Sequence, residues 1–376
     1  MTPDPARDLQ DALELIQREA LHADWVDWAQ VTRECQAMCA GARTTTDLFP
    51  ALRHALAALQ DGHSHLRLPD AGEVHRGIIG LYFTQGVIAL VLPGSPASLA
   101  GLRPGDRLLR IQGQAVGPGV NEGLRQDATL TFEVNQAGKP RVLTLTREDT
   151  RVIPPEPRGR LAAPGIGLVT LPECELNSIL AGGGTYQDRV WDILLDLTAQ
   201  GVTRWVVDLR LNLGGNMWPM LAGIGPLAGE GELGAFVKGE HRWPWSHAGG
   251  EASIDGEVLA RTPGTVRPPL PDTAPVAVLI SPLTASSGEI ITLSFLGRPG
   301  TRLFGEPTRG LTTSNSLYEF PGGAALLITT ALDADRTGRV FSGPIEPDVP
   351  VSTDWAEFQT GKDPVLKAAL AWLENL

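Results

Sequence analysis

Three features of the sequence predict a mixed α/β protein with three regions. Over about the first 66 residues, apolar side chains recur at helical spacing. From about 74 to 149, short apolar runs are interrupted by glycine and proline, as in small β-rich domains. From about 160 to 355, apolar strands alternate with helical patterns, which favours a layered α/β domain. We therefore expect an N-terminal helical region over residues 1–73, a β-rich domain over 74–149 and an α/β core over 150–376.

The composition limits the classes of function. The chain has 376 residues, of which 42% are hydrophobic, and a formal net charge of −12. No basic cluster indicates a nucleic acid or an anionic membrane as a partner. No apolar run approaches the roughly 18 residues of a membrane span, and the start, MTPDPARDLQDALEL, lacks the basic and apolar parts of a signal peptide. We therefore expect a cytoplasmic protein, or an exported one if a targeting segment has been removed.

The three cysteines do not form a zinc motif. Cys35 and Cys39 lie four residues apart in a predicted helix, and Cys174 stands far from both. We interpret all three as core or surface thiols rather than ligands. The sequence indicates no metal and no organic cofactor.

Residues 86–116, GVIALVLPGSPASLAGLRPGDRLLRIQGQAV, predict an apolar strand, a small-residue turn, a short helix ending at Gly101 and a second strand after PGD. This stretch resembles a PDZ domain of the bacterial protease type. The resemblance implies that a preceding loop binds a peptide C-terminus through backbone N–H groups and strand addition. The residues at that position are Gly80, Leu81, Tyr82 and Phe83. The alternative is a small β-rich domain without a ligand.

A serine pair follows an apolar strand in the third region. VAVLIS (276–281) is the expected strand, and a helical pattern begins after Ser286 and Ser287. Serine is a favoured N-cap residue, which is the structural interpretation. The chemical interpretation is that a hydroxyl is presented at a helix N-terminus, where backbone N–H groups and the helix dipole favour negative charge.

Two further segments carry groups that a nucleophilic serine would need. His63 and His65 in QDGHSHLRL (60–68) would share a face if this segment is extended. Gly214 and Gly215 end the strand in DLRLNLGG and could offer a backbone N–H to an oxyanion. Taken alone, a histidine near a helix end is often structural, and paired glycines are often only a turn.

Together these pieces resemble the C-terminal processing peptidases, or tail-specific proteases, and their tricorn-core and nisin-resistance relatives. The resemblance covers roughly residues 50–352 and depends on the order of six motifs: D-G-H-S, a PDZ domain, DLR.N.GG, a serine motif before E-I, GE.T.G and a closing I-x-PDV. It implies a helical N-terminal part, a PDZ domain and a mixed α/β core of the crotonase-like kind.

The resemblance also implies roles for the serines and glycines. In the tail-specific members the nucleophile precedes the glutamate of the motif by three residues, which selects Ser286 before Glu289. Ser287 would then donate its backbone N–H to the oxyanion hole. Gly214 or Gly215 would supply the second donor.

The sequence departs from the tail-specific pattern at the base. Those enzymes use a lysine 25 residues after the serine, where this chain has Leu311, and its four lysines lie far from the motifs. Arg309 cannot replace it because a guanidinium group does not deprotonate in proteins. The chain therefore resembles the histidine-dependent branch, which makes His63 the expected base and His65 the second choice.

The residue that would orient the histidine is less defined by the sequence. Relatives of the tricorn type use a distal carboxylate, and Glu346 lies at a comparable distance after the serine. Asp348 is expected to form a turn, and Asp61 is a further carboxylate close to the motifs. Asn315 could hydrogen-bond near the site.

Residues 229–275 are rich in glycine, proline and tryptophan, and we interpret them as an insertion that forms a lid or a binding loop. Trp218, Trp243 and Trp245 would help to hold a substrate there, or would pack in the interior.

We therefore predict a serine peptidase that cleaves peptides or unfolded proteins through an acyl-enzyme. The alternative is a non-catalytic, PDZ-bearing peptide-binding protein that keeps the peptidase fold. A crotonase-like acyl-transfer enzyme is a third and remote interpretation. The sequence gives no indication of the oligomeric state.

Overall fold

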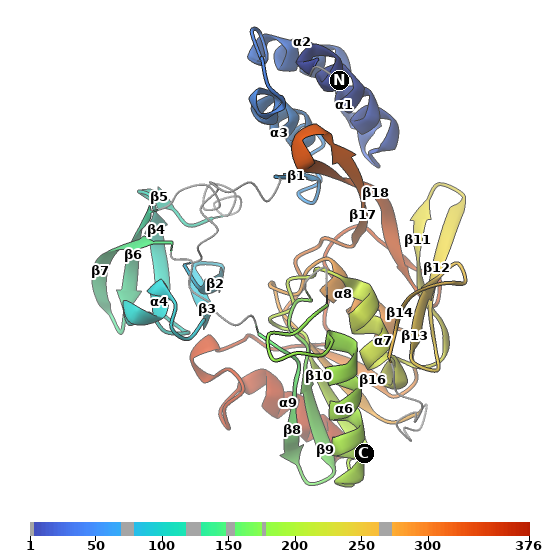
Figure 1. Ribbon diagram of the computed structural model, residues 1–376. Helices are drawn as coiled ribbons and strands as arrows, with labels where there is room; N and C mark the ends of the chain where they lie inside the picture. The colour runs from blue at the N-terminus through green and yellow to red at the C-terminus, as the bar shows by residue number, and fades with distance from the viewer. Residues whose placement is uncertain (1–3, 69–78, 118–128, 148–154, 175–177, 263–272) are drawn as a thin grey trace.

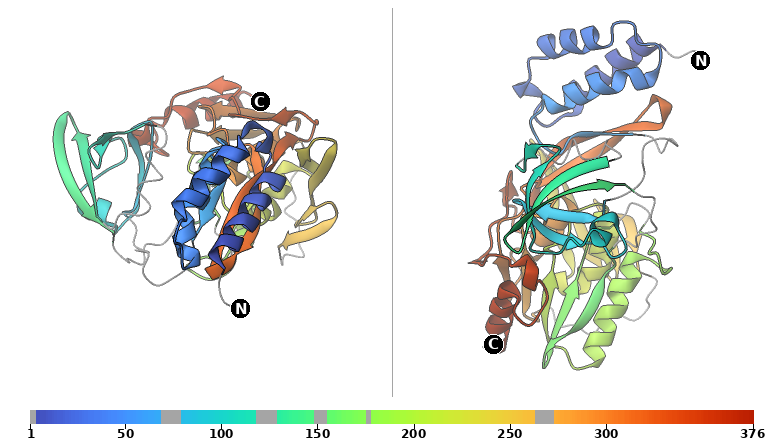
Figure 2. Two further views of the ribbon diagram at one scale, coloured as in Figure 1. Left: turned by 90° about the horizontal axis from the view of Figure 1, so that it is seen from above. Right: turned by 90° about the vertical axis from the view of Figure 1, so that its left-hand side faces the viewer.

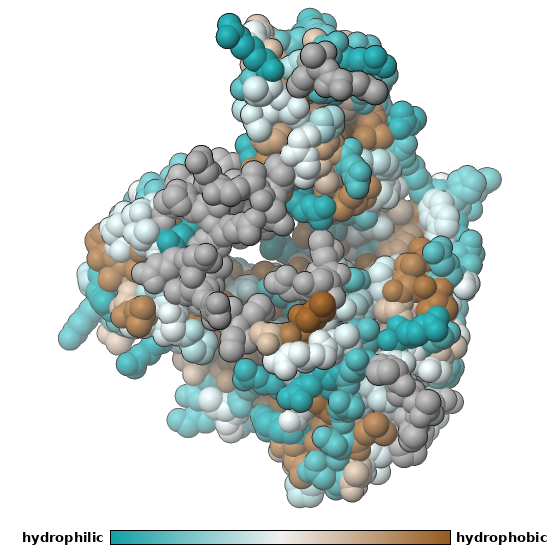
Figure 3. Space-filling model, in the orientation of Figure 1, coloured by the Kyte–Doolittle hydropathy of each residue, from teal (hydrophilic) through white to brown (hydrophobic). Residues whose placement is uncertain are grey.

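The computed structural model describes residues 4–68, 79–117, 129–147, 155–174, 178–262 and 273–376. It contains a helical layer at the N-terminus, a small β domain and a larger α/β core (Figure 1). No helix in these ranges is long and apolar enough to cross a membrane. Exposed large apolar side chains are scattered between polar ones, as the mixed colours of the surface show (Figure 3).

The N-terminal helices are α1 (Pro5–Glu19), α2 (Trp28–Met38) and α3 (Phe49–Ala57), with short 3-10 turns at Ala23–Trp25 and Thr45–Leu48. Aspartate caps at Asp4 and Asp27 accept the first free N–H groups of α1 and α2. The apolar faces of the three helices form one cluster with two long strands, β17 (Thr313–Phe320) and β18 (Ala324–Asp335). The helices consequently lie over these strands (Figure 2).

A short strand follows the helices in the segment that contains His63 and His65. β1 (His65–Arg67) pairs antiparallel with β18, so that His65 lies opposite Leu327. The N-terminal region is therefore attached to the core through a sheet as well as through packed helices.

The small β domain is built from short strands in the order β2-β3-β4-β6-β7, with β5 paired to β4. Its elements are β2 (Leu81–Thr84), β3 (Val87–Val91), α4 (Pro96–Leu99), β4 (Arg107–Ile111), β5 (Gln114–Ala115), β6 (Thr129–Gln136) and β7 (Lys139–Thr146). The expected loop at Gly80 precedes β2, which is the edge strand of this sheet. Residues 74–78, 118–128 and 148–149 of the predicted domain lie outside the described residues.

The core contains a six-stranded sheet in the order β20-β16-β15-β10-β9-β8. The strands are β8 (Arg158–Ala163), β9 (Ile166–Thr170), β10 (Arg204–Asp208), β15 (Val276–Ile280), β16 (Thr301–Gly305) and β20 (Val349–Pro350). β9, β10, β15, β16 and β20 pair in parallel, and β8 is antiparallel. Parallel central strands place the loops that follow them at one edge of the sheet.

Helices cover both faces of this sheet, because its strands alternate two sets of apolar residues. Val207, Val278 and their neighbours pack against α6 (Tyr186–Ala199), α7 (Met217–Ala228) and α8 (Ser287–Phe295). Val206, Leu279 and their neighbours pack against α9 (Pro364–Glu374) on the other face. The separation of α9 from α6 is visible in Figure 2. The predicted layered core is present.

The segment predicted as a lid or binding loop is instead mostly sheet. It contains β11 (Gly231–Lys238), β12 (His241–Ala248), β13 (Glu251–Ile254) and β14 (Glu257–Arg261), which extend β18 as an antiparallel meander. With β1, β17 and β19 (Val340–Phe341) these strands form an eight-stranded sheet. Residues 263–272 of this segment lie outside the described residues.

The tryptophans of this region differ in their surroundings. The Trp245 side chain is completely buried against Phe236, and its indole N–H donates to Ser294 Oγ. Gly234 lies under the same ring, where a Cβ would come 2.2 Å from a ring carbon. Trp245 is therefore a core residue, and the interpretation of it as a substrate clamp is wrong. Trp243 is partly exposed, at 37%.

Candidate active site

Ser286 lies where the chain leaves β15 and begins α8. It is the N-cap residue of α8 and has φ 53° and ψ −119°, a conformation that non-glycine residues rarely adopt. The hydroxyl of Ser287 donates a 2.6 Å hydrogen bond to the carbonyl of Gly215. Ser286 therefore has a strained backbone in the connection between β15 and α8, whereas the hydroxyl of Ser287 is already hydrogen-bonded.

Glu289 fixes the turn that carries Ser286. Its carboxylate is fully buried and accepts four hydrogen bonds, two from main-chain N–H groups at Gly310 and Leu311, one from the Ser286 N–H and one from the Thr308 hydroxyl, all between 2.5 and 2.8 Å. Burial raises the pKa of Glu289, whereas the four donors favour its charged form. The carboxylate ties the start of α8 to the 308–311 loop.

His63 contacts the Ser286 hydroxyl from a distant part of the chain. Its Nε2 lies 3.0 Å from Ser286 Oγ. Asp61 shapes the turn before it by accepting from the N–H groups of His63 and Ser64 at 2.9 and 2.8 Å. Asn315 Nδ2 donates to the His63 carbonyl at 3.1 Å, so this asparagine does hydrogen-bond to the site. The backbone of the histidine turn is therefore held by Asp61 and by Asn315.

The surroundings of His63 favour a neutral ring. Its pKa is lowered from 6.5 to about 4, chiefly by burial, with smaller contributions from the nearby His65 and Arg309, while Asp61 acts in the opposite direction. A neutral imidazole can accept a proton at Nε2. The ring is thus in the protonation state that a general base requires at neutral pH.

The second ring nitrogen of His63 contacts a hydroxyl. Nδ1 lies 2.7 Å from Thr313 Oγ1, at the start of β17. The carboxylate expected in this place is that of Glu346. Glu346 is exposed, and no hydrogen bond joins it to His63 in the described part of the chain. The structure therefore does not bring the expected orienting residue, the exposed Glu346, into hydrogen-bond contact with His63.

The other two polar candidates near the site have different contacts. His65 Nδ1 lies 2.9 Å from the His63 carbonyl oxygen, so the second histidine contacts the backbone of the first. Asp348 Oδ2 accepts from the Leu303 N–H at 2.8 Å and thereby joins two segments of the core, as its predicted structural role requires.

The two glycines of the DLRLNLGG motif occupy positions where a side chain would clash with neighbouring atoms. A Cβ on Gly214 would lie 2.9 Å from the Ser286 Cβ, and one on Gly215 would lie 2.0 Å from the Cys174 carbonyl oxygen. Both have positive φ, at 110° and 98°. Only glycine therefore allows this turn to approach the serine so closely.

The backbone donors at this turn are not equivalent. The Gly214 N–H donates to Asn212 Oδ1 at 3.0 Å. Within the described ranges, the N–H groups of Gly215 and Ser287 have no hydrogen-bond partner. These two are consequently the N–H groups available to an oxyanion, whereas the N–H of Gly214, the other donor considered, is already bonded to Asn212.

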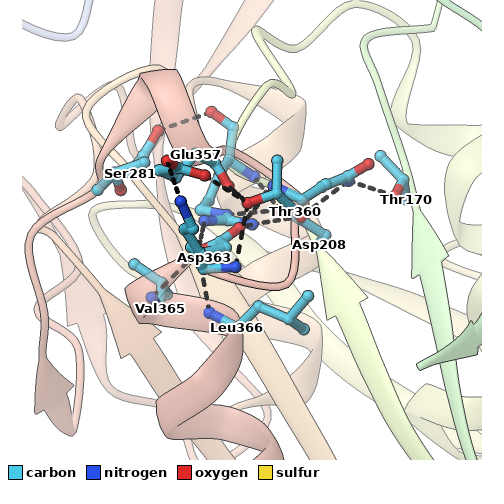
Figure 4. A network of polar contacts seen from close by, with 12 residues as sticks. Thr170, Asp208, Ser281, Glu357, Thr360, Asp363, Val365 and Leu366 are labelled. Carbon is cyan, nitrogen blue, oxygen red and sulfur yellow. Dashed lines mark hydrogen bonds and ion pairs between the residues drawn. The ribbon is translucent and has the colours of Figure 1, made fainter. Parts of the chain in front are cut away.

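Asp208 and Arg210 of the same motif form a buried ionic network with Asp363 (Figure 4). Arg210 donates two hydrogen bonds to Asp208 at 2.9 and 2.8 Å and two to Asp363 at 3.0 and 2.8 Å, and all three side chains are almost fully buried. Asp363 also caps α9 through the N–H groups of Val365 and Leu366. The network fixes the end of β10 that leads to the glycines. The sequence did not identify Asp363, because it lies 153 residues from Arg210.

Residues 165–351 match peptidase family S41, and residues 87–122 match a PDZ domain. The family match contains Ser286, both glycines and the Glu289 clamp in the order described above. The core of the chain, residues 165–351, belongs to peptidase family S41.

The chain is similar in sequence to a nisin-resistance protein and to a carboxyl-terminal-processing protease. The nisin-resistance protein of Lactococcus lactis subsp. lactis is 36% identical over 146 residues, which are 38% of this chain and 45% of that protein. A carboxyl-terminal-processing protease of Picosynechococcus sp. is 26% identical over 318 residues, or 77% of this chain and 69% of the relative. The chain thus spans less than half of the length of the nisin-resistance protein.

A solved photosystem II D1 C-terminal processing protease has the same fold, with a TM-score of 0.62 and 19% identity over 98% of this chain and 97% of that structure. The carboxyl-terminal processing proteases of family S41 are serine peptidases. The predicted family and mixed α/β fold are therefore confirmed, and the family match supports a serine peptidase rather than the non-catalytic alternative.

The chain has no lysine at the position of the tail-specific base. Leu311 occupies it, and its backbone N–H is one of the donors to Glu289. Among the described residues, no group of three or more histidine, cysteine, aspartate or glutamate side chains is arranged to hold a metal ion.

Proposed function

We propose that this chain hydrolyses peptide bonds with Ser286 as the nucleophile and His63 as the general base. The observation that carries the proposal is the 3.0 Å separation of His63 Nε2 and Ser286 Oγ, between groups that are 223 residues apart in the sequence. Such a pair meets the geometric requirement for proton transfer from a nucleophilic hydroxyl. The protein substrates of the family make a peptide or an unfolded protein the proposed substrate class.

The proposed reaction has two stages. Ser286 Oγ attacks the carbonyl carbon of the substrate, while its proton passes to His63 Nε2. The tetrahedral intermediate collapses when His63 returns this proton to the leaving amine, which breaks the C–N bond and leaves an acyl-enzyme. A water molecule then attacks the ester, again with its proton passing to His63, and the acid product leaves with Ser286 restored.

The N–H groups of Gly215 and Ser287 are the proposed oxyanion hole. They flank Ser286 from two segments, the glycine turn after β10 and the start of α8, and both lack other partners within the described chain. Donors that are already fixed stabilise the developing charge without reorganisation, and each is worth about 3 to 4 kcal/mol in comparable sites. The dipole of α8 adds to this stabilisation at its N-terminus.

The small β domain is the proposed binding site for a substrate terminus. Gly80 has φ 80° and is packed against Ser95, where a Cβ would clash at 2.1 Å. Gly80 is followed by Leu81, Tyr82 and Phe83 in β2, the strand that begins the order of the described sheet, and a peptide that binds there by strand addition would lie alongside β2. The proposed division of the chain is a helical region over 1–73, this domain over 74–149 and the peptidase core from 150 to the end.

A fluorophosphonate probe tests the proposed nucleophile directly. We expect wild-type protein to be labelled at Ser286 and Ser286→Ala to be unlabelled. Ser287→Ala is the matched control, because it keeps the backbone N–H and loses only a hydroxyl that contacts the Gly215 carbonyl. Labelling that persists in Ser286→Ala and disappears in Ser287→Ala would assign the roles of the two serines in reverse. Wild-type protein that is never labelled would refute the peptidase chemistry.

A further inference from the structure

We infer that Thr313 is the positioning residue of the general base, with its hydroxyl accepting a hydrogen bond from Nδ1–H of His63. The inference rests on the proposed Ser286–His63 pair and adds a third member to it. A side-chain hydroxyl takes the place in which a carboxylate was expected. Its role is to select the tautomer of His63 and to hold the plane of the ring.

The contacts of the two ring nitrogens carry the argument. His63 Nε2 lies 3.0 Å from Ser286 Oγ, and Nδ1 lies 2.7 Å from Thr313 Oγ1. A neutral imidazole has one N–H donor and one acceptor nitrogen. Because Nε2 must accept the proton of the nucleophile, Nδ1 must carry the hydrogen, and the Thr313 hydroxyl must accept it. No other hydrogen bond to this hydroxyl occurs among the residues that the structure describes.

The position of Thr313 is fixed by the sheet. It is the first residue of β17 and pairs with Leu332 of β18. The register shifts between Ser314 and Asn315, so β17 presents two side chains to the histidine turn: Thr313 contacts the ring and Asn315 contacts the His63 carbonyl. Thr329 Oγ1 donates to Asn315 Oδ1 at 3.0 Å and orients the amide. One strand thus holds both the backbone and the ring of the base.

A neutral partner at Nδ1 has electrostatic consequences. The charged or titratable groups that act on His63 within the described chain are Asp61 and His65 from its own turn and Arg309 from the loop after β16. None of them is a carboxylate hydrogen-bonded to Nδ1. The imidazolium that forms during acylation therefore receives orientation from Thr313, and the one carboxylate that favours its charge, Asp61, acts from a distance rather than through a hydrogen bond to Nδ1. Replacement of the hydroxyl by a carboxylate should change the protonation behaviour of His63 in a predictable direction.

The test compares three variants by the second-order rate at which a fluorophosphonate labels Ser286, measured as a function of pH. Thr313→Val keeps the shape but removes the acceptor, and we expect the rate to fall by about tenfold to a hundredfold. Thr313→Ser keeps the hydroxyl and should stay within a fewfold of wild type. Thr313→Asp places a carboxylate at Nδ1 and should move the acid limb of the profile upward by about one to three pH units.

Thr330→Val is the matched control. Thr330 contacts Ser316 through a hydroxyl–hydroxyl pair at 3.0 Å across the same two strands, without touching His63. We expect its labelling rate and pH profile to equal those of wild type. A loss equal to that of Thr313→Val would mean that any cross-strand hydroxyl matters for the sheet, and the inference would be wrong.

The outcomes separate this inference from the proposed function. Wild-type protein that is never labelled refutes the proposed function itself. Wild-type and Thr313→Val proteins that are labelled at the same rate, with the same acid limb, leave the serine chemistry standing and refute only the role of Thr313. If circular dichroism shows that Thr313→Asp does not fold, the Ser and Val variants decide alone: an equal loss in both refutes the inference, and retention in Ser with loss in Val supports it.

Discussion

The protonation of His63 should make the stability of the protein depend on pH in a defined window. Its folded-state pKa of about 4 lies below the ordinary value of 6.5, chiefly because the ring is buried. Above pH 6.5 the ring is neutral in both the folded and the unfolded chain, and it contributes no pH dependence. Between pH 6.5 and 4 the unfolded chain binds a proton that the folded chain does not bind, so stability falls as the pH falls.

The size of this effect follows from the difference in pKa. A difference of 2.5 units, from 6.5 to about 4, corresponds to about 3 kcal/mol at 1.36 kcal/mol per unit. Water reaches the partly buried ring and screens part of this penalty, so we expect the measured loss to be about 2 kcal/mol.

Urea unfolding followed by tryptophan fluorescence measures this loss between pH 7.5 and 4. The two proteins to compare are Ser286→Ala, which cannot digest itself, and the same protein with His63→Gln. We expect the protein that keeps His63 to lose about 2 kcal/mol more than the His63→Gln protein over this range. Parallel curves would show that the ring is not held neutral by burial.

Two further predictions concern the network under the site and the small β domain. Asp363→Ala leaves the buried Arg210 with one of its two carboxylates and removes the cap of α9, so we expect the free energy of unfolding to fall by about 3 to 5 kcal/mol in urea titrations. Asp354→Ala, which removes an exposed cap, should cost about 1 kcal/mol, and equal losses would contradict a special role for the buried network. For the loop from Gly80 to Phe83, amidation of a bound peptide's C-terminus should weaken its affinity at least tenfold in calorimetric titrations. Unchanged affinity would show that this loop does not bind a terminal carboxylate.

The sequence was sufficient for the parts of the site that lie within short motifs. Ser286, Glu289 and the glycine pair are separated from their neighbouring strands by a few residues, so strand and helix signals placed them directly after buried strands of an α/β core. The distance of His63 from Ser286 along the chain is 223 residues, and only the resemblance to a family connected them.

The orienting residue could not be predicted because it depends on strand register. Thr313 reaches His63 only because β17 begins at this residue and shifts register two residues later. The polar run TTSN was visible in the sequence, but a run of this kind does not show which side chain faces the histidine. Glu346 was chosen by its distance along the chain, which says nothing about its exposure.

The interpretation of 229–275 failed for a different reason. Glycine and proline usually interrupt strands, yet Gly234 makes room for the Trp245 ring and Pro244 lies within β12, opposite Ala235. These residues therefore serve packing and pairing in a meander, although their composition is typical of a loop.

The proposed base, His63, is synthesised 223 residues before the proposed nucleophile, Ser286. His63 belongs to the N-terminal region, Ser286 follows long after it, and Thr313 and the strand β18 that carries the histidine turn come later still. A nascent chain released or paused before these strands contains the histidine without the surface that holds it. Peptide hydrolysis by the proposed pair would thus begin only after Thr313 and β18 have been synthesised and have closed on the histidine turn.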